Sequence, residues 1–151
     1  MNNDKAISVL NNLIETCKDG EYGFKVAAEG VSDTDTRSLF QQFSQQRAGM
    51  ARELQGEVRR LGGDPEKSGS VSGAAHRGWI NIKSAVTGKD EGAIVAEAER
   101  GEDSAKKSYE DALSQGGILS TQTQALIRQQ SSIVHSTHDR VRSLERAVTG
   151  R

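Results

Sequence analysis

The sequence has few of the residues that mark specialised classes of protein. It contains one proline, one cysteine and one tryptophan, and only 4% of its residues are aromatic. A single cysteine, Cys17, excludes an intrachain disulfide framework. With so few rings, a core has to be built mainly from small aliphatic side chains.

An excess of charge of one sign is also missing. The 20 basic and 21 acidic residues leave a net charge of -1, so we expect no general affinity for nucleic acid. No apolar run approaches the roughly 18 residues that a membrane span needs. The first ten residues, MNNDKAISVL, lack the basic segment and apolar run of a secretion signal. These features predict a cytoplasmic protein that binds neither nucleic acid nor membrane.

Apolar residues instead recur at alternating spacings of three and four, the pattern of amphipathic helices packed in a bundle. This pattern predicts four long helices and a shorter one, and no segment has the period-two alternation of an exposed strand. The predicted helices cover residues 4–31, 34–61, 73–87, 90–114 and 120–148. We expect an all-α protein with a single domain over residues 1–151.

The lengths of the links predict how these helices are connected. The first and second long helices are joined by a few residues, as are the third and fourth, so each pair should be antiparallel. The middle link spans roughly 28 residues and contains the short helix, which is long enough to return along the bundle. Two helical hairpins joined by one long crossover form the ferritin-like arrangement.

Each long apolar stripe has one polar interruption close to the middle of its helix. The four residues are Glu21, Arg47, Glu102 and Gln130. The midpoints of antiparallel helices of similar length share one level, so these side chains should meet in the core. An unpaired polar or charged group there would cost several kcal/mol. We therefore predict a buried polar layer made by these four residues.

Ferritin-like di-iron sites occupy this level, with one Glu from each of two helices and Glu-x-x-His from each of the other two. The first and third long helices keep single carboxylates in Glu21 and Glu102, and Glu99 lies one turn before the latter. In the other two helices, the corresponding positions begin at Arg47 and Gln130. They contain neither the Glu nor the His of the Glu-x-x-His motif.

Charge favours a layer without metal. Arg47 is always protonated and brings positive charge to where metal ions would bring theirs. A planar guanidinium suits two carboxylates, so we expect Arg47 to bridge Glu21 and Glu102, with Gln130 completing the hydrogen bonds. The alternatives are a single metal ion held by Glu21, Glu102 and a neighbouring residue, or a working di-iron centre, with iron or another divalent metal as cofactor.

Two histidines give a second candidate metal site. His135 and His138 are three residues apart on one helix and can chelate a metal such as zinc, although two solvated histidines have the same spacing. Cys17 lies on an apolar stripe and is interpreted as a small buried hydrophobe. No phosphate-binding glycine loop, Cys-x-x-Cys pair or nucleophile elbow is present.

Four segments resemble a bacterial family of the ferritin-like superfamily, catalogued as four-helix bundles with a domain of unknown function. They are LNNLIETCKDGEYGF, QQRAGMARELQGEVRRLGGDP, GSVSGAAHRGWINIKSAVTG and AEAERGEDSAKKSYEDAL. The resemblance implies a ferritin-like fold but no stated activity, and the superfamily suggests iron and oxidative-stress chemistry. The family has an acidic residue beside the arginine of its second helix, where this chain has Gln46.

These observations lead to one preferred function and one alternative. The preferred function is a non-enzymatic, stress- or assembly-related bundle in which the polar layer replaces the metal site. Such small bundles often pair, so we expect a homodimer through helix faces, with any other protein partner unidentified. The alternative is a metal-binding protein or a di-iron oxidoreductase with ferroxidase activity.

Overall fold

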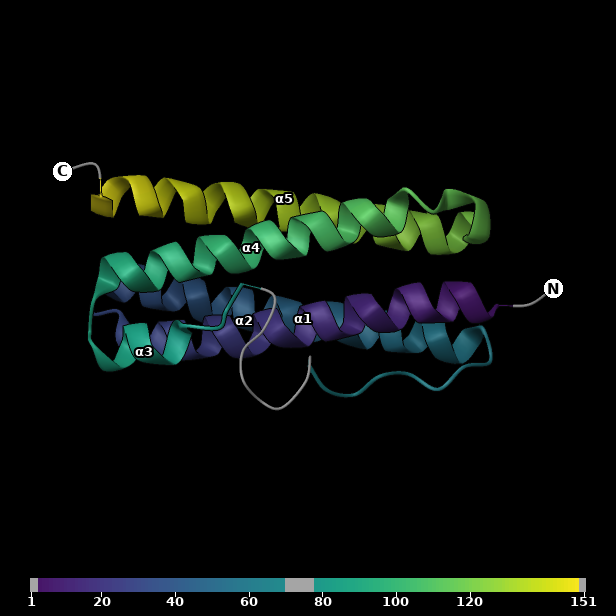
Figure 1. Cartoon of the computed structure of the whole chain (residues 1–151), viewed down its shortest axis with the longest axis horizontal. Coiled ribbons are helices and arrows are strands. Elements are labelled where there is room, and N and C mark those ends of the chain that lie inside the picture. The colour runs from purple at the N-terminus through teal and green to yellow at the C-terminus, as the bar shows by residue number, and fades with distance from the viewer. Residues whose placement is uncertain (1–2, 70–77, 150–151) are drawn as a thin grey trace.

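The computed structural model describes residues 3–69 and 78–149, and all regular structure within those residues is helical (Figure 1). Four long helices run side by side, with one short helix at an end of the bundle. They are α1 (Asp4–Gly30), α2 (Thr34–Arg60), α3 (Ile82–Thr87), α4 (Glu91–Leu113) and α5 (Thr121–Thr149), with a 3-10 turn, η2 (Gly116–Ile118), before α5. No helix of the described residues is long and apolar enough to cross a membrane.

The long helices agree with the sequence prediction to within one residue at each end, but the short helix does not. It was predicted over residues 73–87, and within the described residues it begins only at Ile82. Residues 73–77 lie outside the described part. Gly78 has a φ of +96°, and the chain turns through Trp79 before α3 begins. Such a backbone favours glycine and ends any regular helix at this point.

The helices form two antiparallel hairpins. α1 packs along α2, and α4 packs along α5, while α1 also contacts α4. Figure 1 shows α2 and α4 running in the same direction, because the chain returns from the end of α2 to the end where α3 and α4 begin. α2 and α5 face each other with the loosest approach of the neighbouring long pairs.

Local sequence signals fix where the helices begin and end. The Asp33 carboxylate accepts a hydrogen bond from the Thr36 backbone N–H at 2.9 Å, and Asp90 accepts one from Ala93 at 3.1 Å, so α2 and α4 each begin at an acidic cap. α2 ends at Arg60, and Gly62, two residues beyond, has a φ of +87° that prevents the helix from continuing.

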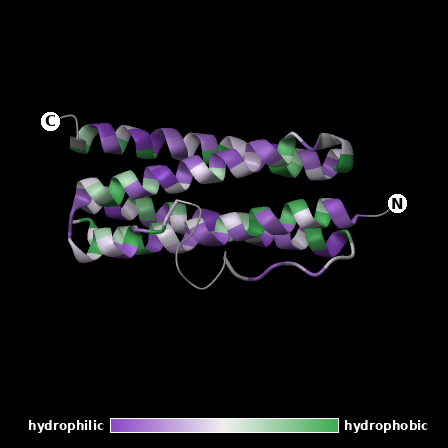
Figure 2. Cartoon of the chain, viewed as in Figure 1, coloured by the Kyte–Doolittle hydropathy of each residue, from purple (hydrophilic) through white to green (hydrophobic). Residues whose placement is uncertain are grey.

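The core is divided along its length into two clusters. The first, here called the aliphatic core, includes Leu10, Leu13, Ile14, Cys17, Met50, Leu54, Val58, Ala105, Tyr109, Ile127 and Val134. The second, here called the aromatic core, includes Phe24, Ala27, Phe40, Phe43, Trp79, Ile82, Ile94, Ala98 and Val141. Figure 2 shows apolar and polar residues on every long helix, as expected for helices with one buried face.

Trp79 joins the crossover to the bundle through a slot that lacks side chains. Its indole lies 1% exposed between α1 and α4, and it packs edge-on against Phe24 at 4.9 Å between ring centroids. The slot exists because Gly23 of α1 and Gly101 of α4 carry no Cβ. A Cβ at these positions would lie 2.2 Å and 2.1 Å from atoms of the ring.

Substitution of Gly101 by alanine should therefore expel the ring. We expect Gly101→Ala to lower the free energy of unfolding by about 3 kcal/mol, since overpacking outweighs the gain in helix propensity. Urea unfolding followed by circular dichroism measures the loss, and the emission of the single tryptophan should shift to longer wavelength.

Gly56→Ala is the matched control, because Gly56 lies inside α2 and a Cβ added there would have no atom within 4 Å. That change should stabilise the protein by about 0.4–1 kcal/mol. Equal effects of the two substitutions would show that the Trp79 slot is not tightly packed.

Candidate functional site

A charged pair lies in the centre of the bundle, at the level that separates the two cores. Arg47 of α2 and Glu102 of α4 form an ion pair with 2.6 Å between Nη2 and Oε2, and their side chains are 1% and 0% exposed. Thr137 of α5 completes the group. Its hydroxyl accepts from Arg47 Nη2 at 2.8 Å and donates to Glu102 Oε2 at 2.6 Å. Three helices are thereby joined by one buried polar cluster, here called the central ion pair.

The remaining long helix, α1, contributes no side chain to this cluster and instead leaves room for Arg47. Gly20 of α1 faces Arg47, and a Cβ there would lie 3.0 Å from Nη1 and 3.3 Å from Cγ. The guanidinium also lies 5.6 Å from the centre of the Phe24 ring, within the range of a cation–π contact. Burial lowers the pKa of Arg47, but the Glu102 charge and the hydrogen bond to it, together with smaller effects of Cys17 and Tyr109, outweigh burial, and the net pKa is raised. Arg47 is therefore a permanent buried cation.

Glu21 does not belong to this cluster, and the prediction that Arg47 bridges it to Glu102 is wrong. The Glu21 side chain is 35% exposed and lies 3.4 Å from Lys18 on the same helix. The interior position at this level is taken by Gly20, which is buried. A glycine does not register in an apolar stripe, so the sequence pattern assigned the position to the next residue.

Gln130 is buried, as predicted, but it belongs to a second network. Its Oε1 accepts from the Tyr109 hydroxyl at 2.7 Å, and its Nε2 donates to the Met50 carbonyl at 3.2 Å and to Glu53 at 2.9 Å. Gln130 and Thr137 are two turns apart on α5, about 10 Å along the axis. That separation explains why Gln130 contacts neither member of the central ion pair.

The second network includes the only cysteine. Cys17 Sγ lies 3.1 Å from the Tyr109 hydroxyl, inside the aliphatic core. Burial raises the pKa of the Cys17 thiol to about 11 and raises the pKa of Tyr109 well above its usual value. A thiol in this state carries almost no thiolate at neutral pH, so Cys17 is a poor nucleophile and a poor metal ligand.

The remaining candidate metal ligands lie along the seam between α4 and α5 and have other partners. His138 is buried and its Nε2 lies 2.5 Å from Asp103, whereas His135 is partly exposed and faces Glu110 at 3.8 Å. The two rings therefore contact different carboxylates. Glu99 is hydrogen-bonded to the side chain of Glu145. Burial of Glu145, together with this hydrogen bond, raises the pKa of Glu145.

The residues at the central level do not fit a bound metal. Of the four predicted polar-layer residues, two carry carboxylates, but Glu21 is partly exposed and lies outside the cluster. The one that remains, Glu102, already has a permanent cation 2.6 Å away. A divalent ion at that oxygen would be repelled by Arg47. Among the residues that the structure describes, no group of three or more His, Cys, Asp or Glu side chains is arranged to hold a metal ion.

Three further buried carboxylates, Asp19, Glu57 and Glu97, were not predicted as core residues, and the contacts of the two glutamates are defined. Glu57 accepts hydrogen bonds from Arg60 and from the Thr123 hydroxyl, which lowers its pKa. Glu97 accepts from Arg100 and from the backbone N–H of Asn81 in the crossover. In both helices a glutamate precedes an arginine by three residues. That spacing was a visible signal, and it marks where α5 and the crossover attach to the bundle.

Comparison with known proteins adds a family but no activity. A family model described as "Domain of unknown function (DUF2383)" matches residues 5–115. No protein with a curated description matches the chain.

The contribution of the central ion pair to stability can be measured by replacing Arg47 and Glu102 singly and together. Arg47→Met strands the buried Glu102 and should lower the free energy of unfolding by about 3–5 kcal/mol at neutral pH. Adding Glu102→Leu should recover most of that loss, since two apolar side chains can replace a buried pair. Urea unfolding of the single and double variants measures the coupling.

The loss in Arg47→Met should also depend on pH. A lone buried Glu102 has a raised pKa, so the folded variant holds a proton that the unfolded chain releases above about pH 4.3. The penalty therefore grows as pH rises. Arg52→Met, at an exposed arginine of α2, is the control and should cost less than about 0.5 kcal/mol. Additive effects of the Arg47 and Glu102 changes would contradict the coupling.

Proposed function

The chain belongs to the family of the domain of unknown function DUF2383, and for this member we propose a non-catalytic, ferritin-like bundle in which an ion pair replaces the metal site. We propose that it acts in the cytoplasm through its surface and its assembly, in a structural or stress-related role. The observation that carries the proposal is the buried Arg47 guanidinium at the central level.

The connectivity supports the ferritin-like part of the proposal. Two antiparallel hairpins are joined by a crossover, and α2 and α4 run in the same direction (Figure 1). A simple up-and-down bundle would make those helices antiparallel and would need only a short link between them. The polar cluster also lies between two apolar cores, at the level where such bundles place their metal ligands.

Charge balance supports the replacement of metal by arginine. Two iron(II) ions bring four positive charges, which a ferritin-like site balances with four carboxylates. Here the central level has one carboxylate and one guanidinium, so its formal charge is neutral without any added ion. The Thr137 hydroxyl donates a hydrogen bond to the same oxygen, Glu102 Oε2, that accepts from Arg47. The other oxygen, Glu102 Oε1, has no hydrogen-bond partner among the described residues, but a single carboxylate oxygen beside a guanidinium gives a metal little to bind.

The other reactive groups near this level support a non-catalytic role. The Cys17 thiol has a pKa of about 11 because of burial, and Tyr109 is held as a neutral phenol. Neither supplies a nucleophile or a general base at neutral pH. We therefore propose that the function lies on the outside of the bundle, in a homodimer formed through helix faces or in contacts with another protein.

The test is elemental analysis of protein purified in air, combined with an iron(II) oxidation assay. We expect less than about one-tenth of an equivalent of iron, manganese or zinc per chain, and oxidation no faster than in the buffer blank. Glu102→Gln and Glu21→Gln should leave both results unchanged.

Stoichiometric iron that is lost in Glu21→Ala and Glu102→Ala would contradict this proposal and favour a metal-binding protein or ferroxidase. Metal lost only on changing His135 and His138 would place a site at the seam of α4 and α5 instead. Either result would still leave the helical fold as described.

A further inference from the structure

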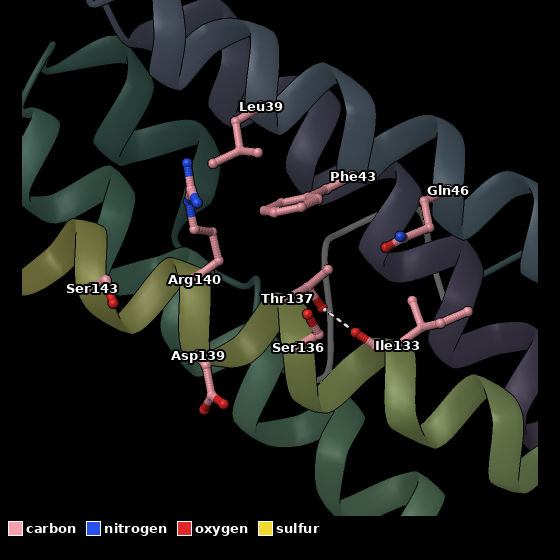
Figure 3. A pocket seen from close by; sticks show the side chains of 9 residues that line it. All are labelled: Leu39, Phe43, Gln46, Ile133, Ser136, Thr137, Asp139, Arg140 and Ser143. Atoms are coloured by element: carbon pink, nitrogen blue, oxygen red, sulfur yellow. Dashed lines mark hydrogen bonds between the residues drawn. The ribbon is translucent and has the colours of Figure 1, made fainter.

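A groove opens between α2 and α5, on the side of the bundle where the long helices approach each other least. It has a volume of about 560 Å³ and is lined by Leu39, Phe43, Gln46, Ile133, Ser136, Thr137, Asp139, Arg140 and Ser143. This volume lies within the range of small-molecule sites, roughly 300–1,000 Å³. Figure 3 shows the Phe43 ring projecting into the space between the two helices.

The two ends of the groove offer different chemistry. At one end the Arg140 side chain extends from α5 toward Leu39, whereas Asp139 points away from the groove (Figure 3). Within the described part of the chain Arg140 has no ion-pair partner. The charge offered to an occupant at this end is therefore positive.

At the other end lies an unused hydrogen-bond acceptor. Gln46 Oε1 is buried from solvent and has no hydrogen-bond partner among the described residues. The Thr137 hydroxyl is not available to an occupant, because it is bonded to Arg47 and Glu102. A buried acceptor without a donor costs free energy that a ligand's hydroxyl or amide N–H would recover.

The middle of the groove is apolar and short. Leu39 and Gln46 are separated by two turns of α2, about 10 Å along the axis. Phe43 lies between the two polar ends, and Ile133 lies across from Gln46 (Figure 3). Among the described residues, the exposed large apolar side chain, Ile80 at 66%, lies in the crossover and not around this groove. The polar surroundings favour a small ligand over a docked helix, which would need a longer apolar surface.

We propose that this groove binds a small amphiphilic carboxylate, with its carboxylate on Arg140 and its apolar body on Phe43. The body matches the two helical turns between the polar ends, about 10 Å, and a hydroxyl or amide N–H at its far end donates to Gln46 Oε1. This role is separate from the proposed metal-free centre, because the groove residues other than Thr137 take no part in the central ion pair. A ligand seated here would lie directly over Thr137 and so adjoin the central cluster.

The probe is ω-hydroxydecanoate, titrated into the full-length protein by isothermal calorimetry. Decanoate lacks the terminal hydroxyl, and the corresponding decane diol lacks the carboxylate. We expect saturable binding of ω-hydroxydecanoate with a sub-millimolar dissociation constant, and weaker binding of both comparison compounds. Arg140→Gln should weaken ω-hydroxydecanoate binding about tenfold and leave diol binding unchanged.

Gln46→Leu should remove the advantage of ω-hydroxydecanoate over decanoate, which we expect to be about fivefold. Arg142→Gln is the control, since Arg142 is an exposed arginine of α5 that does not line the groove. It should change none of the affinities. Circular dichroism of each variant verifies that the helices are retained.

Three results would overturn the proposal. The first is no saturable binding at millimolar ligand, and the second is an equal effect of Arg140→Gln and Arg142→Gln. The third is a wild-type dimer in light scattering that Leu39→Glu converts to a monomer, because the groove would then be an interface between copies of the chain.

Discussion

The Arg47–Glu102 ion pair is the constraint on which the rest of the bundle depends. A charge removed from water must be matched, or the folded state loses several kcal/mol. Here the match joins α2 to α4, and Thr137 adds α5 through the same carboxylate oxygen. The helices must therefore meet in one register, with Arg47 opposite Glu102, which fixes how the two hairpins lie along each other.

Several features around the pair follow from its geometry. Arg47 needs room, and Gly20 supplies it by having no side chain. Next to the ion pair, the crossover contributes Trp79 to the aromatic core, where its ring packs between α1 and α4. On the opposite side α2 and α5 are joined through hydrogen bonds of Thr123, Gln130 and Thr137. The space left between the two helices beside Thr137 is the groove that we propose as a ligand site.

Much of the fold could be predicted from sequence, because helical periodicity and link length are local properties. The centre could be predicted only in part. Arg47, Glu102 and Gln130 are buried as the stripes indicated, but Gln130 joins a separate network. Glu21 was misplaced because Gly20, invisible in an apolar pattern, occupies its interior position. Successive residues of a helix are rotated by about 100° around its axis. Only packing against the neighbouring helices decides which of the two, Gly20 or Glu21, faces the core.

In the proposed function, the bonded Arg47 guanidinium occupies the level where a ferritin-like bundle would hold metal. The most direct measurement is the side-chain ¹⁵N–¹H spectrum of Arg47, assigned by comparison with Arg47→Lys and recorded while zinc(II) is added. We expect separate, slowly exchanging Nη signals that do not move with added metal. Signals averaged by exchange with water, or shifts that saturate at one equivalent of zinc, would contradict it.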